Sequence, residues 1–408
     1  MERGGHERTL ALAEGPLASF AVGFVAWLVE RGYRPRSVRV QLRLLADFSG
    51  WLSDERLEPA ELTVDAAARF LRDRRERVAE STGARALGPL VGYLREVGVV
   101  PQRLGSMETP VERLLADYRD YLDRERGLAV VTVAGLERVA RLFLVERPAP
   151  LDEALQRLDA GAVTAFVMAQ CSSGRLGTGA GKNLTGGLRS LLRFLHLAGW
   201  TPVGLADAVP SVAGWRLASL PRALEAGQVA RLLESCDRAT VIGRRDFAIL
   251  TLLSRLGLRA GEVAGLELDD IDWRAGELTI HGKGSTIERL PVPHQVGEAL
   301  VAYLRDGRPA TELRLVFLPV RAPLKRLSSM AITAVVRYAC DRAGIERVGA
   351  HRLRHTIATE LLAAGASLAQ IAPILRHASV STTAIYAKVD RRALRPLARP
   401  WPLAEGMR

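Results

Sequence analysis

The sequence predicts a mainly α protein of three domains with one small antiparallel sheet. Two stretches, 15–101 and 110–202, show the same succession of helical patterns, and the remainder mixes helical patterns with one hairpin signal. The chain has 408 residues, more than one hydrophobic core usually supports, which suggests about two to four domains. Hydrophobic residues make up 48% of the chain, so each domain can bury a packed core.

The two N-terminal stretches are alike at both ends. Each starts with an amphipathic helix before an Arg-Gly pair and closes with an apolar helix before a glycine; the matching glycines are Gly32 and Gly127, and Gly98 and Gly199. We expect Gly98 and Gly199 to stop helices, and Ser37 and Thr132 to be N-caps. An internal duplication explains this likeness, although two unrelated bundles of four or five helices would also look similar.

The remainder of the chain begins after a proline-rich linker and is expected to be helical around one hairpin. Helices are predicted at 229–233, 245–256, around Glu262, and at 296–304 and 329–343; strands are predicted at 277–281 and 288–292. The expected domains are 1–106, 107–205 and 222–390, with a linker at 206–221 and a tail at 391–408.

The charge of the chain favours an anionic partner. The formal net charge is +12 and the pI about 10.3, which suits nucleic acid better than an acidic small molecule. Lysine is rare, however, at Lys182, Lys283, Lys325 and Lys388, and the abundance of Arg, Ala and Leu also fits biased codon usage. Charge alone therefore leaves DNA binding undecided.

Neither a disulfide framework nor a metal site is expected. Cys171, Cys236 and Cys340 lie far apart and form no Cys/His cluster, so a reducing cytoplasm is the predicted location. The apolar run at 16–29 follows Glu14 and is shorter than the roughly 18 residues that a membrane span needs. We interpret it as a buried helix and expect no membrane partner.

A phenol, two imidazoles and a guanidinium are gathered between Gly349 and Val389. His351 and Arg354 are three residues apart, so they share one face at the start of a predicted helix, where backbone N–H groups also favour an anion. His377 follows in a turn, and Tyr386 is a nucleophile that can form a covalent phosphoryl intermediate. The neighbouring His355 is expected to pack or cap.

Two upstream residues complete this set. Arg259 follows a helix stop, where its planar guanidinium can bind two phosphate oxygens, and Lys283 at a glycine-flanked hairpin tip can protonate a leaving alkoxide. Read singly, Arg259 is also explained as a surface arginine paired with Glu262, and Lys283 as a solvated turn residue.

The full set resembles the tyrosine recombinase, or phage integrase, family. The signature of that family is Arg, Lys, His-x-x-Arg, His or Trp, and Tyr, and the match covers about 222–390. Residue by residue it gives Arg259, Lys283, His351, Arg354, His377 and Tyr386. Three longer motifs also resemble those of the family: Leu-Gly-Leu-Arg-x-x-Glu, Gly-Lys-Gly and His-x-Leu-Arg-His-Thr.

The resemblance implies a site-specific recombinase that needs neither ATP nor a metal. The two arginines would clamp the scissile phosphate, Tyr386 would attack it, and Lys283 would protonate the departing 5′ oxygen. His351 would assist proton transfer, His377 would hydrogen-bond the phosphate, and Glu262 would be structural support. The product would be a 3′-phosphotyrosyl bond.

The resemblance also implies partners: double-stranded DNA recombination sites, with a homotetramer assembled on two of them, or a tetramer shared with related recombinases. The second helical stretch corresponds to the family's core-binding domain. The first stretch, within 1–106, departs from the common pattern, and it could bind further DNA or make protein contacts. The expected biological context is a mobile element. The tail at 391–408 would dock on a neighbouring subunit through Trp401.

Two other functions remain open from the sequence. A type IB topoisomerase uses a similar set of residues, although the integrase-like spacing and the helical N-terminus argue against it. A non-catalytic DNA-binding regulator would explain a helix, Gly365 and a second helix as a helix-turn-helix. No spacing identifies side chains outside the active site that contact DNA, because base readout depends on docked geometry.

Overall fold

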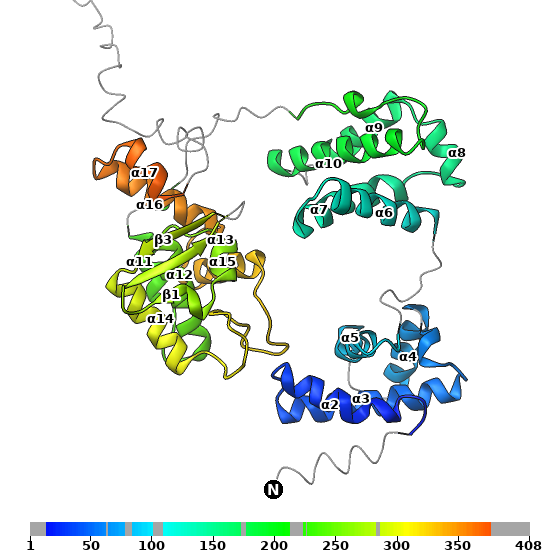
Figure 1. Ribbon diagram of the computed structural model, residues 1–408, viewed down its shortest axis with the longest axis horizontal. Coiled ribbons are helices and arrows are strands. Elements are labelled where there is room, and N and C mark those ends of the chain that lie inside the picture. Colours follow the sequence, from blue (N-terminus) through cyan, green and yellow to red (C-terminus); the bar gives the residue numbers. More distant parts are fainter. Residues whose placement is uncertain are drawn as a thin grey trace, which may run out of the picture. The chain divides into compact units, whose positions relative to one another are not determined.

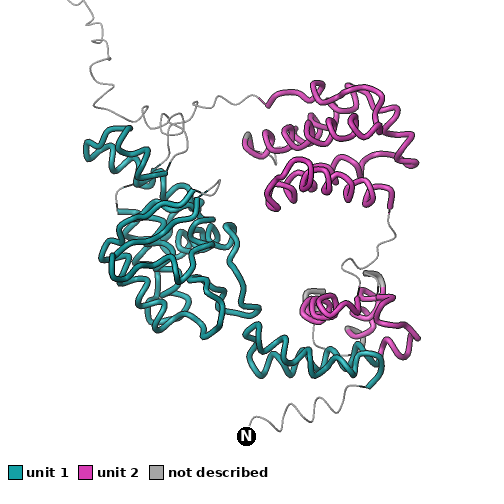
Figure 2. The backbone as a smooth tube through the Cα atoms, viewed as in Figure 1, with its two compact units in different colours: residues 1–50, 219–408 teal, residues 51–218 magenta. Residues whose placement is uncertain are grey.

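The computed structural model describes residues 14–62, 64–77, 84–100, 109–172, 177–212, 223–225, 227–282 and 286–376. This part is mostly helical with a three-stranded antiparallel sheet (Figure 1), which confirms the predicted fold class. Two compact units are distinguished, Met1–Gly50 with Ser219–Arg408, and Trp51–Ala218 (Figure 2). Among the described helices, none is long and apolar enough to cross a membrane.

The N-terminal helices are α2 Ala21–Glu30, α3 Pro35–Asp54, α4 Val64–Arg77 and α5 Gly88–Glu96. The first boundary between the units falls within α3. Helix α2 buries Phe24 and Leu28, which are four residues apart and therefore lie on one face, as predicted for this apolar run.

Two predicted N-caps are wrong. Helix α3 begins at Pro35 rather than after Ser37, because the fixed φ of proline suits the first helical turn. Helix α7, Val130–Val145, begins after Ala129, so Thr132 lies inside its first turn. The predicted stops are confirmed, since the matching glycines all adopt a left-handed conformation: Gly32 (φ 76°), Gly98 (76°), Gly127 (56°) and Gly199 (77°).

The second helical region contains α6 Pro110–Asp120, α7, α8 Leu151–Gln156, α9 Ala160–Ser172 and α10 Thr178–Leu197. Its core is rich in aromatic residues, with the ring centroids of Phe143 and Phe166 5.0 Å apart. The hydroxyl of buried Tyr118 donates to Ser190 Oγ at 2.8 Å, and burial raises the pKa of Tyr118 to about 12. This phenol is therefore a protonated core group.

The C-terminal region combines seven helices of the described chain with the sheet: α11 Gln228–Glu234, α12 Val241–Arg255, α13 Ala260–Gly265, α14 His294–Asp306, α15 Ser329–Ala343, α16 Ala350–Ala363 and α17 Leu368–Ile374. Helix α12 starts earlier than predicted because Thr240 Oγ1 accepts the Gly243 N–H at 3.0 Å. It packs against α14, α15 and α16 and is the centre of the apolar core.

The sheet contains β1 Ile271–Asp272, β2 Glu277–His281 and β3 Ile287–Pro291 in the order β1-β2-β3. The predicted hairpin is confirmed, with Leu278 opposite Leu290, and the short strand β1 is an addition. Leu278 and Ile280 are buried while the residues between them are not, so one face of β2 packs on the core. The hairpin tip at 283–285 lies outside the described residues.

A pair of adjacent glycines in α10 tests the packing of the second helical region. A Cβ on buried Gly187 would lie 3.0 Å from Val139 of α7, whereas a Cβ on Gly186 would meet nothing within 4 Å. We expect Gly187→Ala to lower the melting temperature relative to Gly186→Ala, which should raise it by improving helix propensity by roughly 0.5–1 kcal/mol. Equal melting temperatures of the two variants would show that α7 and α10 are not packed this closely.

Candidate active site

Arg259 lies in a tight connection between α12 and α13. Gly257 has φ 58° in this turn, and a Cβ there would lie 3.1 Å from Leu375, so glycine is required on both grounds. The Glu262 carboxylate accepts the backbone N–H of Arg259 at 2.8 Å and its Nη1 at 2.6 Å. The first turn of α13 therefore fixes Arg259 through both its backbone and its guanidinium.

Glu262 is buried and bonded to a second arginine. Its side chain is 5% exposed, and Oε2 also accepts Arg376 Nη2 at 3.0 Å. Burial raises the pKa of Glu262, but the Arg259 N–H, the charge of Arg376 and the Arg259 guanidinium outweigh that effect, so the net pKa is lowered. The carboxylate is thus ionised at neutral pH.

Arg354 reaches the same turn from α16. The residue is 1% exposed, and its Nη1 donates to the Gly257 carbonyl at 2.5 Å. That carbonyl precedes Arg259 by two residues, so the two predicted phosphate-binding arginines are anchored at one turn although they are far apart in sequence. As predicted, His351 and Arg354 lie in the first turns of a helix.

The imidazoles of His351 and His355 meet edge to face with centroids 4.4 Å apart. His351 keeps an exposed surface, yet partial burial and then the charges of Arg354 and Arg259 lower its pKa. Burial, followed by His351 and two arginines, lowers the pKa of His355 to about 4. Both rings are therefore uncharged near neutral pH, and His351 can accept a hydrogen bond or a proton.

A cavity of about 430 Å³ adjoins Arg259, whereas Arg354, His351 and His355 are not part of its lining. Its lining includes Arg259, Glu262, Arg376 and, from the hairpin, Gly282 and Thr286. The last two flank 283–285 in sequence, and the Gly282 N–H donates to the Thr286 carbonyl at 2.7 Å. The base of the lysine hairpin thus forms one wall of the cavity. Lys283, His377 and Tyr386 themselves lie outside the described residues.

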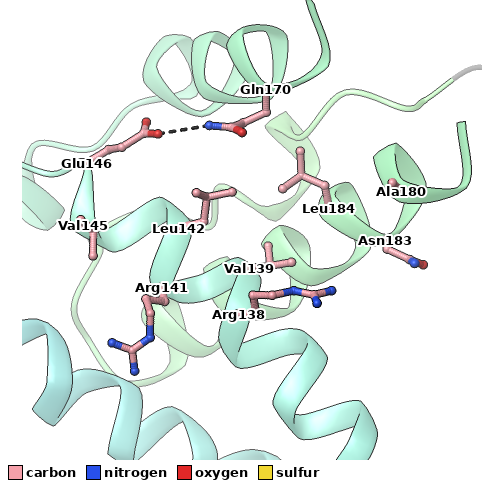
Figure 3. A pocket seen from close by; sticks show the side chains of 10 residues that line it. All are labelled: Arg138, Val139, Arg141, Leu142, Val145, Glu146, Gln170, Ala180, Asn183 and Leu184. Atoms are coloured by element: carbon pink, nitrogen blue, oxygen red, sulfur yellow. Dashed lines mark hydrogen bonds between the residues drawn. The ribbon is translucent and has the colours of Figure 1, made fainter. Parts of the chain in front are cut away.

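A larger cavity, about 710 Å³, lies in the second helical region (Figure 3). Val139 and Leu142 of α7 and Leu184 of α10 contribute aliphatic walls, and Gln170 donates to Glu146 at 3.1 Å. This lining contains no imidazole and no tyrosine, so it lacks the predicted chemistry.

The arrangement suits an anion with two adjacent negative oxygens. Arginines bind phosphate through paired N–H donors, and a preorganised cationic site stabilises charge that develops on the equatorial oxygens of a phosphoryl group.

In the described part of the chain, no group of three His, Cys, Asp or Glu side chains is placed to hold a metal ion.

Arg376 is not among the residues that the motif predicts. Its guanidinium is 4% exposed, and its carbonyl accepts Arg259 Nη2 at 2.8 Å. In the sequence, the only indication that Arg376 belongs to the site is its position immediately before His377. Its contacts could not be predicted, because they depend on the backbone conformation at the end of α17. The structure therefore adds a third arginine to the predicted pair.

Comparison with known proteins places these features in a family. The model of the phage integrase family matches residues 222–392. A Sinorhizobium fredii protein named as an integrase/recombinase, y4rA, is 41% identical over 394 residues, which cover 95% of each chain. Tyrosine recombinase XerD of Mycobacterium tuberculosis is 35% identical over 307 residues, covering 69% of this chain and 94% of XerD.

Solved structures show the same fold. XerH site-specific recombinase bound to a palindromic difH substrate matches with a TM-score of 0.56 at 19% identity, over 74% of this chain and 99% of that chain. A lambda integrase dimer bound to a core site matches with a TM-score of 0.52 at 17% identity, over 72% and 98%. The 41% identity to y4rA over 95% of each chain, the 35% identity to XerD and the family model show that the chain belongs to the tyrosine recombinase (phage integrase) family and is a site-specific DNA recombinase.

Proposed function

We propose that the chain cleaves and rejoins DNA strands through a 3′-phosphotyrosyl intermediate on Tyr386. The observation that carries this proposal is the meeting of Arg259 and Arg354 at the Gly257 turn, where Arg259 lines a cavity together with Gly282 and Thr286 of the hairpin base. Two guanidinium groups at one turn can hold the two non-bridging oxygens of a phosphodiester.

The proposed step exchanges one phosphoester bond for another. The Tyr386 oxygen attacks phosphorus, the bond from phosphorus to the 5′ oxygen breaks, and Lys283 gives a proton to that oxygen. His351 accepts the phenolic proton, for which its lowered pKa keeps the ring neutral, and His377 donates to the phosphate. A 5′ hydroxyl of a second strand reverses the step, so the bond energy is conserved.

Replacing the nucleophile tests this proposal. Tyr386→Phe should abolish the covalent adduct with a nicked suicide substrate while DNA affinity stays within about twofold, because only the attacking oxygen is removed. Tyr338→Phe is the matched control, since Tyr338 is 61% exposed on α15 and should react normally. Adduct formation by Tyr386→Phe would refute the assignment, and a Tyr386→Phe protein that keeps full biological output would favour a non-catalytic regulator.

We also propose the division of labour along the chain. Residues 222–390 form the catalytic domain, and 107–205 form a core-binding domain that completes a clamp on the duplex, joined by the linker 206–221. Residues 1–106 are an additional helical domain, and the shared left-handed glycines support its origin as a duplicate. Recombination for a mobile element is the role we propose for this larger architecture.

Helix α3 of the additional domain carries a stripe of exposed arginine side chains. Arg36, Arg39 and Arg43 are spaced three and four residues apart, so they lie on one face over about 10 Å. All three are exposed, and within the described chain none of their guanidinium groups makes a hydrogen bond or an ion pair. No acidic residue occurs from Arg31 to Ala46. Such a face complements a phosphate backbone, and we propose that it contacts DNA beside the core site.

A single charge reversal tests the stripe. Arg39→Glu in the full chain should weaken binding to an arbitrary 40-base-pair duplex. The plot of the logarithm of the binding constant against the logarithm of salt concentration should become less steep by about 0.9 for each phosphate that the variant no longer binds. Arg72→Glu on α4 is the control, because Arg72 is exposed but lies off the stripe. Equal affinities and slopes for both variants would exclude the DNA contact, and weakened self-association alone would indicate a protein contact.

Assembly is proposed to involve a homotetramer on two DNA sites, alone or with related recombinases, and the tail at 391–408 is proposed to dock on a neighbouring subunit. The tail lies outside the described residues, and the support for docking is its composition, with Trp401 among prolines. Deleting 395–408 should weaken tetramer formation on DNA, measured by sedimentation, with binding to a single site retained. Unchanged assembly would contradict the proposed docking.

A further inference from the structure

Arg376 has an unusual backbone conformation directly before a predicted catalytic histidine. Its φ is 53°, in the left-handed region that side chains other than glycine rarely adopt. Among the non-glycine residues of the described chain, it shares this property with Arg56. A side chain retained at such a position implies that its interactions offset the backbone strain.

The guanidinium of Arg376 joins two parts of the active site. Nη2 donates to Glu262 Oε2 at 3.0 Å and lies 3.5 Å from the Gly257 carbonyl, which also accepts from Arg354. Nε lies 3.9 Å from Glu288 Oε2 on β3, the strand that follows the lysine hairpin tip. The Arg259 turn and the hairpin are therefore both linked to this side chain.

The backbone of Arg376 contacts Arg259 directly. Its carbonyl oxygen accepts Arg259 Nη2 at 2.8 Å, while Arg259 Nη1 donates to Glu262 Oε1. We propose that Arg376 is a positioning residue that holds the Arg259 guanidinium ready for the scissile phosphate. This inference rests on the phosphate-binding role proposed for Arg259.

The charge balance explains why a second arginine is useful. A buried Glu262 with Arg259 as its sole cationic partner would hold that guanidinium in a neutral ion pair, and the pair would attract a phosphate weakly. Arg376 neutralises part of the same carboxylate, so Arg259, Arg376 and Glu262 carry a net charge of one positive unit. The net charge is the same when Glu288 and Arg354, the other charged groups near Arg376, are included. Arg259 is then oriented by Glu262 and keeps charge available for the DNA.

Arg376→Gly isolates the side chain, because glycine accepts the left-handed conformation and keeps the carbonyl that binds Arg259. In single-turnover cleavage of a saturating nicked substrate, we expect the rate to fall about 10- to 100-fold with DNA affinity nearly unchanged. In an Arg259→Lys background, the same change should lower the rate less than about threefold, because the residue through which Arg376 acts is already impaired. A wild-type rate, or an equal fall in both backgrounds, would overturn the proposal.

Arg376→Lys covers the case in which the glycine variant does not fold. It keeps the charge but loses the planar fork, so we expect a cleavage rate below that of the wild type at unchanged DNA affinity. Arg245→Lys is the matched control, since Arg245 forms a similarly buried pair with Asp246 at 2.8 Å and should cleave normally. A wild-type rate for Arg376→Lys would contradict the proposal. If Arg259→Ala cleaves normally in this assay, the proposed function of Arg259 has failed instead.

Discussion

The active site depends on one buried carboxylate. Glu262 is 5% exposed and receives the Arg259 backbone, the Arg259 guanidinium and the Arg376 guanidinium. Losing the Glu262 carboxylate would leave the buried Arg376 guanidinium without its partner, a change that typically costs about 3–5 kcal/mol. The position of Arg259, which is proposed to bind the phosphate, is therefore tied to the stability of the domain itself.

This carboxylate is held where three elements converge. The Gly257 turn ends α12, Arg354 of α16 donates to the Gly257 carbonyl, and Leu375 after α17 would meet any side chain placed at Gly257. Because α12 is also the centre of the apolar core, the arginines are supported by rigid helices rather than by a free loop. Such support is what a site needs if it is to bind a phosphate without rearrangement.

Local patterns predict much of this architecture. Helix α15 has the predicted bounds, Ser329 to Ala343. The sequence Ser367-Leu368-Ala369-Gln370 is typical of a capping box, and this box forms, with Ser367 Oγ accepting the Gln370 N–H at 3.3 Å. Both follow from interactions within a few residues. The end of α12 near Gly257 and the hairpin turn that begins at Gly282 are also predictable, because each depends on a local glycine.

Other features depend on contacts between distant residues and are not predictable from local patterns. The misplaced starts of α3 and α7 are local errors instead, since α3 begins at Pro35 and α7 begins after Ala129, which makes no side-chain cap. The involvement of Arg376 depends on its positive φ and on contacts with residues more than a hundred positions away. The order of residue types identifies the candidate set, whereas the shared turn at Gly257 requires the fold.

The most direct test of the proposed mechanism is to map the covalent bond in the wild-type protein. After reaction with a nicked suicide substrate, the adduct is digested with nuclease and trypsin and analysed by mass spectrometry. Trypsin cleaves after Arg376 and Lys388, so we predict a 3′-linked nucleotide on the peptide from His377 to Lys388, which contains a single tyrosine. A nucleotide on any other peptide, or one linked through its 5′ phosphate, would contradict this mechanism.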